Sequence, residues 1–138
     1  MDDLFTAIYT RFSTTPYSSF YNGVNGELHL EEASSSATMP YAVYNMVSSV
    51  HDWTFTSDFE ETVFDFNLFS DSTGGATEIT QLYEKLKDQF DDCVLTVSGY
   101  THLKMRRENA YLSVDSEAIP NKRIWQYTVQ FRNLIQKN

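Results

Sequence analysis

The spacing of apolar residues changes from strand-like to helix-like between residues 61 and 90, and this change constrains the fold most. Over residues 61–69 apolar and polar residues alternate, as in a strand with one buried face. Over residues 76–90 the apolar positions are those of an amphipathic helix: Ile79, Leu82, Tyr83, Leu86 and Phe90. A near-continuous apolar run at residues 41–50 predicts an earlier long strand. The stretch therefore predicts two strands that lead into a helix.

The rest of the chain adds one more helix and three more strands. Apolar residues at helical spacing predict a helix over residues 3–13. Strands are expected at residues 93–98, 103–114 and 123–134. Adjacent strands with two separate helices predict an α+β fold, with a mostly antiparallel sheet and two helices packed on one face, in a single domain spanning residues 1–138.

The alternation also predicts which side chains form the core. One face of the strand at 61–69 and one face of the strand at 123–134 are apolar, and the apolar stripe of the helix at 76–90 is expected to cover them. The predicted core residues are Phe64, Phe66, Leu68, Trp125, Tyr127, Val129 and Phe131 on the sheet, and Ile79, Leu82, Leu86 and Phe90 on the helix.

Residues 17–38 are expected to form a loop that projects from the domain. Asn22-Gly23 and Asn25-Gly26 are turn dipeptides, and the serines at 34–36 have the composition of a flexible segment. Residues 27–31 alternate and predict a brief edge strand.

Charge is unevenly distributed along the 138 residues, whose net charge is −9. Residues 1–92 carry 3 Lys/Arg and 16 Asp/Glu, whereas residues 93–138 carry 7 and 3. Gripping nucleic acid through its phosphates needs a basic surface, so this balance argues against a DNA-gripping role. It fits either an acidic, solubilising surface or a two-faced subunit whose acidic side meets a basic side of a neighbour.

The sequence also favours a soluble protein made in the cytoplasm. The acidic start Met1-Asp2-Asp3 is unlike a signal peptide, and no apolar run reaches the roughly 20 residues that span a bilayer. The sole cysteine, Cys93, excludes an internal disulfide and fits a reducing compartment. We expect no contact with a membrane.

Residue spacing predicts neither an enzyme nor a metal or cofactor site. The three histidines, His29, His51 and His102, are scattered and do not form a ligand motif. Cys93 lacks an activating neighbour in the sequence and is interpreted as a small buried residue. We therefore expect no catalytic residues, no metal ligands and no cofactor.

Lys104, Arg106 and Arg107 form the one basic concentration in the sequence. On a strand, Lys104 and Arg106 point to one face and Arg107 to the other. They are interpreted either as a solvated edge that discourages aggregation or as a subunit contact. In the second interpretation they meet carboxylates of the next subunit, and the candidates are Glu60, Glu61 and Asp65.

The whole layout resembles the tail-completion, or tail terminator, proteins of long-tailed bacteriophages, also called head-to-tail joining proteins. The resemblance rests on the helix pattern from Leu4 to Phe12, the strand opening Met39-Pro40-Tyr41-Ala42-Val43-Tyr44, the strand and Ser/Asp-rich turn from Phe64 to Ser72, the helix with Ile79, Leu82 and Leu86, and the aromatic strand from Trp125 to Phe131. Residues 22–26 depart from the family, because they replace an Arg-Ile-Tyr type segment.

The resemblance implies a structural virion protein without catalytic residues. It implies a homo-oligomeric ring, commonly a hexamer, at the head-proximal end of the tail tube. Such a ring ends tube growth and contacts both the tail tube protein and the head-completion or connector protein, while DNA passes through its lumen without specific binding. The alternative, from a different class, is a small ligand-binding or enzymatic α+β domain with a pocket between the helix at 76–90 and the sheet.

Overall fold

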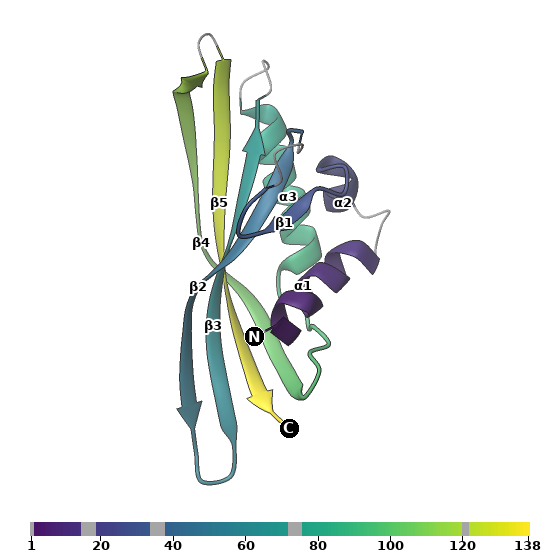
Figure 1. Cartoon of the computed structure of the whole chain (residues 1–138), viewed down its shortest axis with the longest axis vertical. Helices are drawn as coiled ribbons and strands as arrows, with labels where there is room; N and C mark the ends of the chain where they lie inside the picture. The colour runs from purple at the N-terminus through teal and green to yellow at the C-terminus, as the bar shows by residue number, and fades with distance from the viewer. Residues whose placement is uncertain (1, 15–18, 34–37, 72–75, 120–121) are drawn as a thin grey trace.

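Helices lie along one side of a long, twisted sheet in the computed structural model of the chain, which describes residues 2–14, 19–33, 38–71, 76–119 and 122–138 (Figure 1). The elements, in chain order, are α1 (Asp2–Thr14), α2 (Ser19–Gly23), β1 (Leu28–Leu30), β2 (Tyr41–Trp53), β3 (Asp58–Ser70), α3 (Thr77–Phe90), β4 (Tyr100–Ile119) and β5 (Lys122–Lys137).

The sheet has the strand order β1-β2-β3-β5-β4 in the described part of the chain. Three neighbouring pairs are antiparallel, and the short β1 pairs in parallel with β2 at residues 42–44. The prediction of an α+β fold with a mostly antiparallel sheet is confirmed. The sheet is mixed rather than purely antiparallel, and the described residues form three helices rather than the expected two.

The core lies between the sheet and α3, where the alternation of β3 and β5 placed it. Phe66 is fully buried, and its ring lies 5.0 Å from that of Phe90 on α3 and 5.5 Å from that of Phe131 on β5. Nine of the predicted core residues are buried, whereas Trp125 and Tyr127 are half-buried and pack against the cluster. The nine are Phe64, Phe66, Leu68, Ile79, Leu82, Leu86, Phe90, Val129 and Phe131.

Helix α1 packs on the same side of the sheet and is tied to α3. The ring of Phe5 meets that of Phe64 edge-on at 5.5 Å. The Arg11 side chain donates from Nε to the backbone oxygen of Gln89 at 2.8 Å, and the Gln89 amide donates back to the Arg11 backbone oxygen at 3.0 Å. This reciprocal pair of hydrogen bonds fixes the two helices to each other.

The expected projecting loop at 17–38 instead packs on the body over its described part, residues 19–33. Phe20, Val24 and Leu28 are buried. The ring of Phe20 on α2 lies between the rings of Phe12 and Phe90. The expected edge strand is present as β1. Residues 17, 18 and 34–37 lie outside the described residues.

Residues 93–98 are extended but do not form the expected strand of the sheet. Cys93, Leu95 and Val97 are buried on alternate positions, so the alternation reports one-sided burial rather than strand pairing. The segment is held by His102, whose Nδ1 accepts the backbone N–H of Leu95 at 3.0 Å. Because Nδ1 accepts, Nε2 carries the proton and donates to Asn133 Oδ1 at 2.8 Å.

Truncation of the central aromatic side chain should strongly destabilise the fold. We expect Phe66→Ala to lower the free energy of unfolding by about 3–5 kcal/mol, because a buried ring leaves a cavity that its neighbours only partly fill. Phe55, fully exposed in the turn between β2 and β3, is the matched control, and Phe55→Ala should stay within about 0.5 kcal/mol. Urea denaturation of both variants measures this, and equal losses would contradict the core assignment.

The buried histidine should make stability depend on pH. Burial lowers the pKa of His102 below its ordinary value of 6.5, although the hydrogen bond to Asn133 opposes the shift. The unfolded chain therefore binds this proton more readily than the folded chain. The stability that neutral His102 contributes is complete above about pH 6.5 and is lost as the pH falls through the lowered folded pKa.

Urea denaturation at about pH 7.5 and about pH 5 should show this loss in the wild-type chain. His102→Gln removes the titrating group, so the variant should lose less stability over the same range. Equal losses in the two proteins would assign the pH dependence to other groups.

Candidate subunit interface

The face of the sheet opposite the helices carries a connected row of polar side chains. At its centre is Asn67 on β3, whose Nδ2 donates to Asn45 Oδ1 on β2 at 3.1 Å. Asn67 Oδ1 accepts from Thr128 Oγ1 at 2.9 Å and from Gln126 Nε2 at 3.1 Å, both on β5. These groups satisfy one another, so this helix-free face is polar without presenting unpaired charge at its centre.

Charged groups continue the row toward the β2–β3 hairpin, and they neutralise one another. Arg132 on β5 lies between two carboxylates, with an ion pair to Glu61 on β3 and a hydrogen bond of 2.9 Å from Nη2 to Glu108 Oε2 on β4. These bonds raise the pKa of Arg132 above its ordinary value and hold the pKa of the Glu108 carboxyl below its usual range. The Arg132 guanidinium therefore has its ion-pair partners, Glu61 and Glu108, within its own chain.

Asp65 adds a further carboxylate to this face, beside Gln130. Burial raises the pKa of Asp65, and the Gln130 amide, which donates to Asp65 Oδ1 at 3.2 Å, opposes that shift. The expectation from sequence included Asp65 and Glu61 as interface carboxylates. The structure places both on the helix-free face, but each already has a partner in its own chain.

The basic residues predicted for the interface are divided between the two faces. Arg106 pairs with Arg132 in the strand register and is exposed on the helix-free face. Arg107 lies on the helix side, where it bonds to Tyr83 and to Asp91, with 3.1 Å from Nε to Oδ1. Lys104 aligns with Leu134 in β5, and its side chain lies outside the described side chains. Of the three, Arg106 alone is described as exposed on the helix-free face.

The third predicted carboxylate, Glu60, does not join Glu61 and Asp65. It points to the opposite face of β3, where Ser49 Oγ donates to Glu60 Oε1 at 2.5 Å. The structure therefore brings Arg106, Glu61 and Asp65 to one face and leaves Arg107 and Glu60 on the other.

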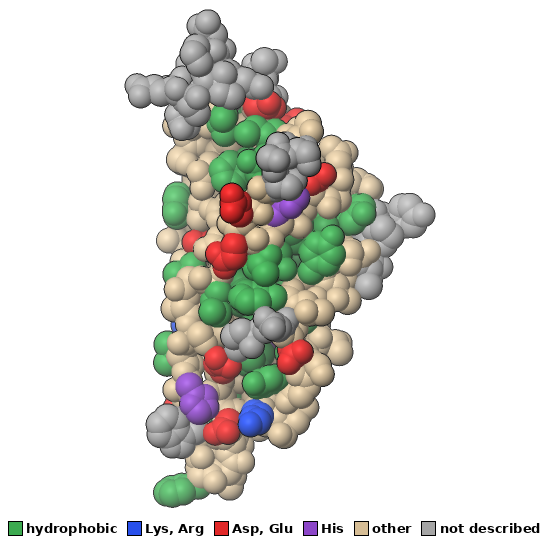
Figure 2. Space-filling view, in the orientation of Figure 1, with side chains coloured by type: hydrophobic (Ala, Val, Ile, Leu, Met, Phe, Trp, Pro, Cys, Tyr) green, Lys and Arg blue, Asp and Glu red, His purple; other side chains and the backbone are tan. Residues whose placement is uncertain are grey.

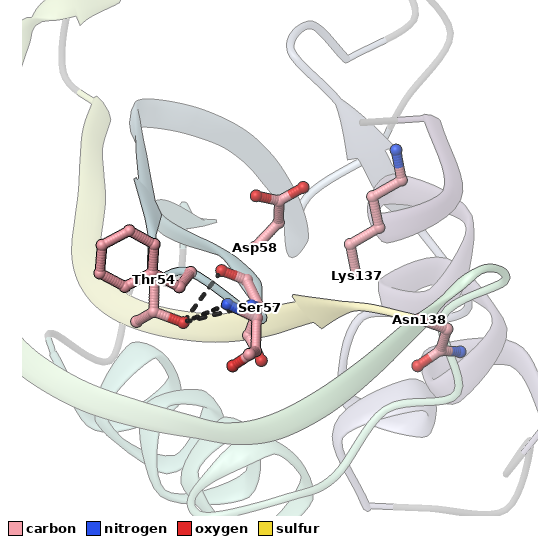
Figure 3. A pocket seen from close by; sticks show the side chains of 7 residues that line it. Thr54, Ser57, Asp58, Lys137 and Asn138 are labelled. Atoms are coloured by element: carbon pink, nitrogen blue, oxygen red, sulfur yellow. Dashed lines mark hydrogen bonds between the residues drawn. The ribbon is translucent and has the colours of Figure 1, made fainter.

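The turn between β2 and β3 presents an aromatic side chain that the sequence analysis did not single out. Phe55 is fully exposed at the end of a hairpin that extends beyond the helices (Figure 1). Thr54 holds the turn, because its backbone N–H donates to the Ser57 oxygen at 2.8 Å and its Oγ1 accepts the Ser57 N–H at 3.1 Å (Figure 3). The end of β5 supports it through Gln136 Nε2, which donates to Ser57 Oγ at 3.2 Å.

A polar hollow of about 390 Å³ lies against this turn. Asp58, Lys137 and Asn138 line it together with residues 54–57 (Figure 3). It is open to solvent at the tip of the hairpin, and its aromatic wall is Phe55. The hollow is polar and open, unlike the enclosed apolar cavity of a small-molecule site.

Neither a metal cluster nor a membrane-spanning helix occurs in the described part of the chain. His29 bonds to Glu27 at 2.7 Å, His51 lies 3.9 Å from Asp58, and His102 is the buried residue near the core. Cys93 is buried as predicted, and burial raises the pKa of its thiol.

The surface in the orientation of Figure 1 carries acidic side chains along much of its length and few basic ones (Figure 2). This distribution agrees with the acidic residues 1–92, which supply α1, β1, β2 and β3.

Comparison with known proteins gives a fold rather than a family. No protein-family model matches the chain, and no curated protein matches it. Among solved structures, a chain from the virion of a native gene transfer agent particle superposes with a TM-score of 0.73, at 12% identity, over 95% of this chain and 92% of that one. A second solved structure has a TM-score of 0.53 at 16% identity, over 99% of this chain and 94% of that one.

The two neighbouring arginines should respond differently to charge reversal. Arg107→Glu removes the bonds to Asp91 and Tyr83 and sets a carboxylate beside Asp91, so the free energy of unfolding should fall by about 1 kcal/mol. Arg106→Glu should change it by less than about 0.5 kcal/mol, because that side chain is exposed. Urea denaturation compares the two variants, and equal effects would overturn the assignment of faces.

Proposed function

We propose that this protein is a structural subunit of a phage-type virion, in which copies form a ring at the head-proximal end of the tail tube. In this role the ring ends tube growth and joins the tail to the head, as the resemblance to tail terminator proteins implies. The supporting observation is the agreement in fold with a chain of a gene transfer agent virion, at a TM-score of 0.73 over 95% of the residues. Residues 1–138 act as one domain in this assignment, and six is the ring number that the resemblance favours.

The two faces of the sheet suit a wall around a channel. The helix side is filled by aromatic rings, and the centre of the helix-free face is polar, as the wall of a lumen can be. Phosphates bind to cations that are free to meet them, and Arg132 is held between two carboxylates instead. Arg106 is a further, exposed cation on this face, but the carboxylates of Glu61, Asp65 and Glu108 outnumber Arg106 and Arg132. We therefore expect DNA to pass such a face without being gripped by it.

The filled core argues against the alternative of a ligand-binding or enzymatic domain. That alternative requires a pocket between α3 and the sheet. Phe66, Phe90 and Phe131 occupy this space with ring centroids 5.0–6.4 Å apart. The described hollows lie at the hairpin and at strand ends, where Asp58 and Tyr41 are among the lining residues.

The hairpin tip is then the part that reaches a different virion protein. Phe55 is a large apolar side chain on a braced turn, so it can enter a partner's pocket with little loss of conformational entropy. Its partner in this role is the tail tube protein or the connector protein on the head side.

Co-assembly with the tail tube protein of the same phage tests this function. Native mass spectrometry and negative-stain imaging should show closed rings of this chain capping tubes of defined length. Tubes that grow without limit in its presence, with this chain remaining monomeric, would overturn the proposal.

Phe55→Ala should weaken attachment of this chain to its partner about tenfold without changing its fold. Tyr9→Ala is the matched control, because Tyr9 is an exposed aromatic residue on α1, away from the hairpin. Sedimentation of the chain with tubes and with connectors measures both variants. Binding of Phe55→Ala at the wild-type level to both partners would contradict the proposed contact through Phe55.

A further inference from the structure

Two strand edges of the sheet lack a neighbouring strand over part of their length among the described residues. β1 covers β2 only at residues 42–44, so the outer edge of β2 is open beyond that point to Trp53. β4 is the last strand at the other side of the sheet. Residues 92 and 93 bond to the backbone of Met105, and no other described strand pairs with the outer edge of β4 over residues 109–115. Open edges present unpaired backbone N–H and C=O groups that another strand can bind.

Part of each open edge lacks the features by which proteins normally prevent such pairing. On β4 the register shifts at 102/104 and 107/109, and charged residues fill the stretch between the shifts. Residues 109–115 then run in regular register with β5, and residues 110–114 carry no charge. On β2 the register shifts at 46/48 and is regular from Ser48 to Trp53. Bulges and charges protect edges. These two segments have no register shift and carry a formal charge only at Asp52 and Asp115, so we call them the unprotected segments.

Apolar side chains are exposed along both unprotected segments. Val50 on β2 is 59% exposed and Tyr111 on β4 is 57% exposed, and their strand partners place both on the helix-free face. Leu112 and Val114, also on β4, are 42% and 48% exposed. Pairing of the two edges would cover these side chains as well as the backbone groups.

We infer that residues 48–53 of one copy of this chain add to residues 109–115 of a second copy, as an antiparallel strand pair. This inference rests on the proposed function and names the contact by which the ring closes. The two edges differ, so the contact is heterologous. In a row of copies, each end copy has one unused edge, and further copies can add until a ring closes.

Strand direction and charge both favour the antiparallel arrangement. β2 runs antiparallel to β3, β3 to β5, and β5 to β4, so β2 and β4 run in opposite directions within one copy. A rotation about an axis along the strands keeps these directions and brings β2 of the next copy antiparallel to β4. This orientation turns the exposed Asp52 at the end of β2 toward the end of β4 that carries exposed Arg106.

Disulfide trapping on the full chain tests the contact. Val50→Cys is combined with Tyr111→Cys, or with Ser113→Cys for the adjacent register, since all three positions face the helix-free side. Oxidation of a double variant should give a ladder of dimers, trimers and larger species, because each copy offers two different edges. Each single variant should give dimers at most. Val50→Cys combined with Val94→Cys is the matched control, because Val94 is 63% exposed but lies outside both edges.

The outcomes separate the contact from the function. A ladder from an edge pair that is absent from the Val94 control supports the pairing. Rings that form on tail tubes while neither edge pair gives a ladder overturn the pairing and leave the proposed function standing. A chain that forms neither rings nor ladders overturns both. Circular dichroism of each variant, matched to wild type, shows that the fold is retained.

Discussion

The packing of three phenylalanine rings between α3 and the sheet is the interaction on which the other features depend. Phe66 contacts Phe90 and Phe131, and it stacks on Tyr44 at 5.9 Å, so one ring joins β2, β3, β5 and α3. Because this cluster concentrates apolar burial on one side of the sheet, the other side is free to be polar. The same arrangement lets the β2–β3 hairpin extend beyond the helices without losing its anchorage in the core (Figure 1).

The helix-free face shows how a sheet can be left uncovered and still be a defined surface. Amide and hydroxyl groups centred on Asn67 bind one another, and Arg132 is balanced by Glu61 and Glu108. A surface whose polar groups are already paired offers little to a passing ligand, whereas the strand edges and the hairpin tip retain unsatisfied or apolar groups. The contacts that we propose therefore lie at the margins of the sheet, along its strand edges and at the hairpin tip.

Much of the fold could be predicted because β3, β5 and α3 each bury one face, and one-sided burial is what periodicity records. The helix Ser19–Gly23 has too few residues to show a period, so the sequence predicts a loop there. Residues 93–98 alternate without pairing, since alternation reports burial and not hydrogen bonding. Because neighbouring residues of a strand face opposite sides, the sequence predicts that Arg106 and Arg107 lie on different faces. It cannot predict the bond of Arg107 to Asp91, because that bond joins β4 to the end of α3 and no local pattern shows that these two parts lie close together. Phe55 was missed because a single aromatic residue in a turn has no period at all.

The uncharged residues 110–114 at the edge of β4 have a consequence for the behaviour of the free protein. A net charge of −9 makes separate copies repel one another, and this repulsion acts over about 8 Å at physiological ionic strength. An edge that binds strands would otherwise be a route to open-ended aggregates. If copies pair as proposed, repulsion at a distance combined with attraction at contact gives an energy barrier to association, so we expect free copies to associate slowly in dilute solution. Association would then be fast only where a partner holds several copies close together.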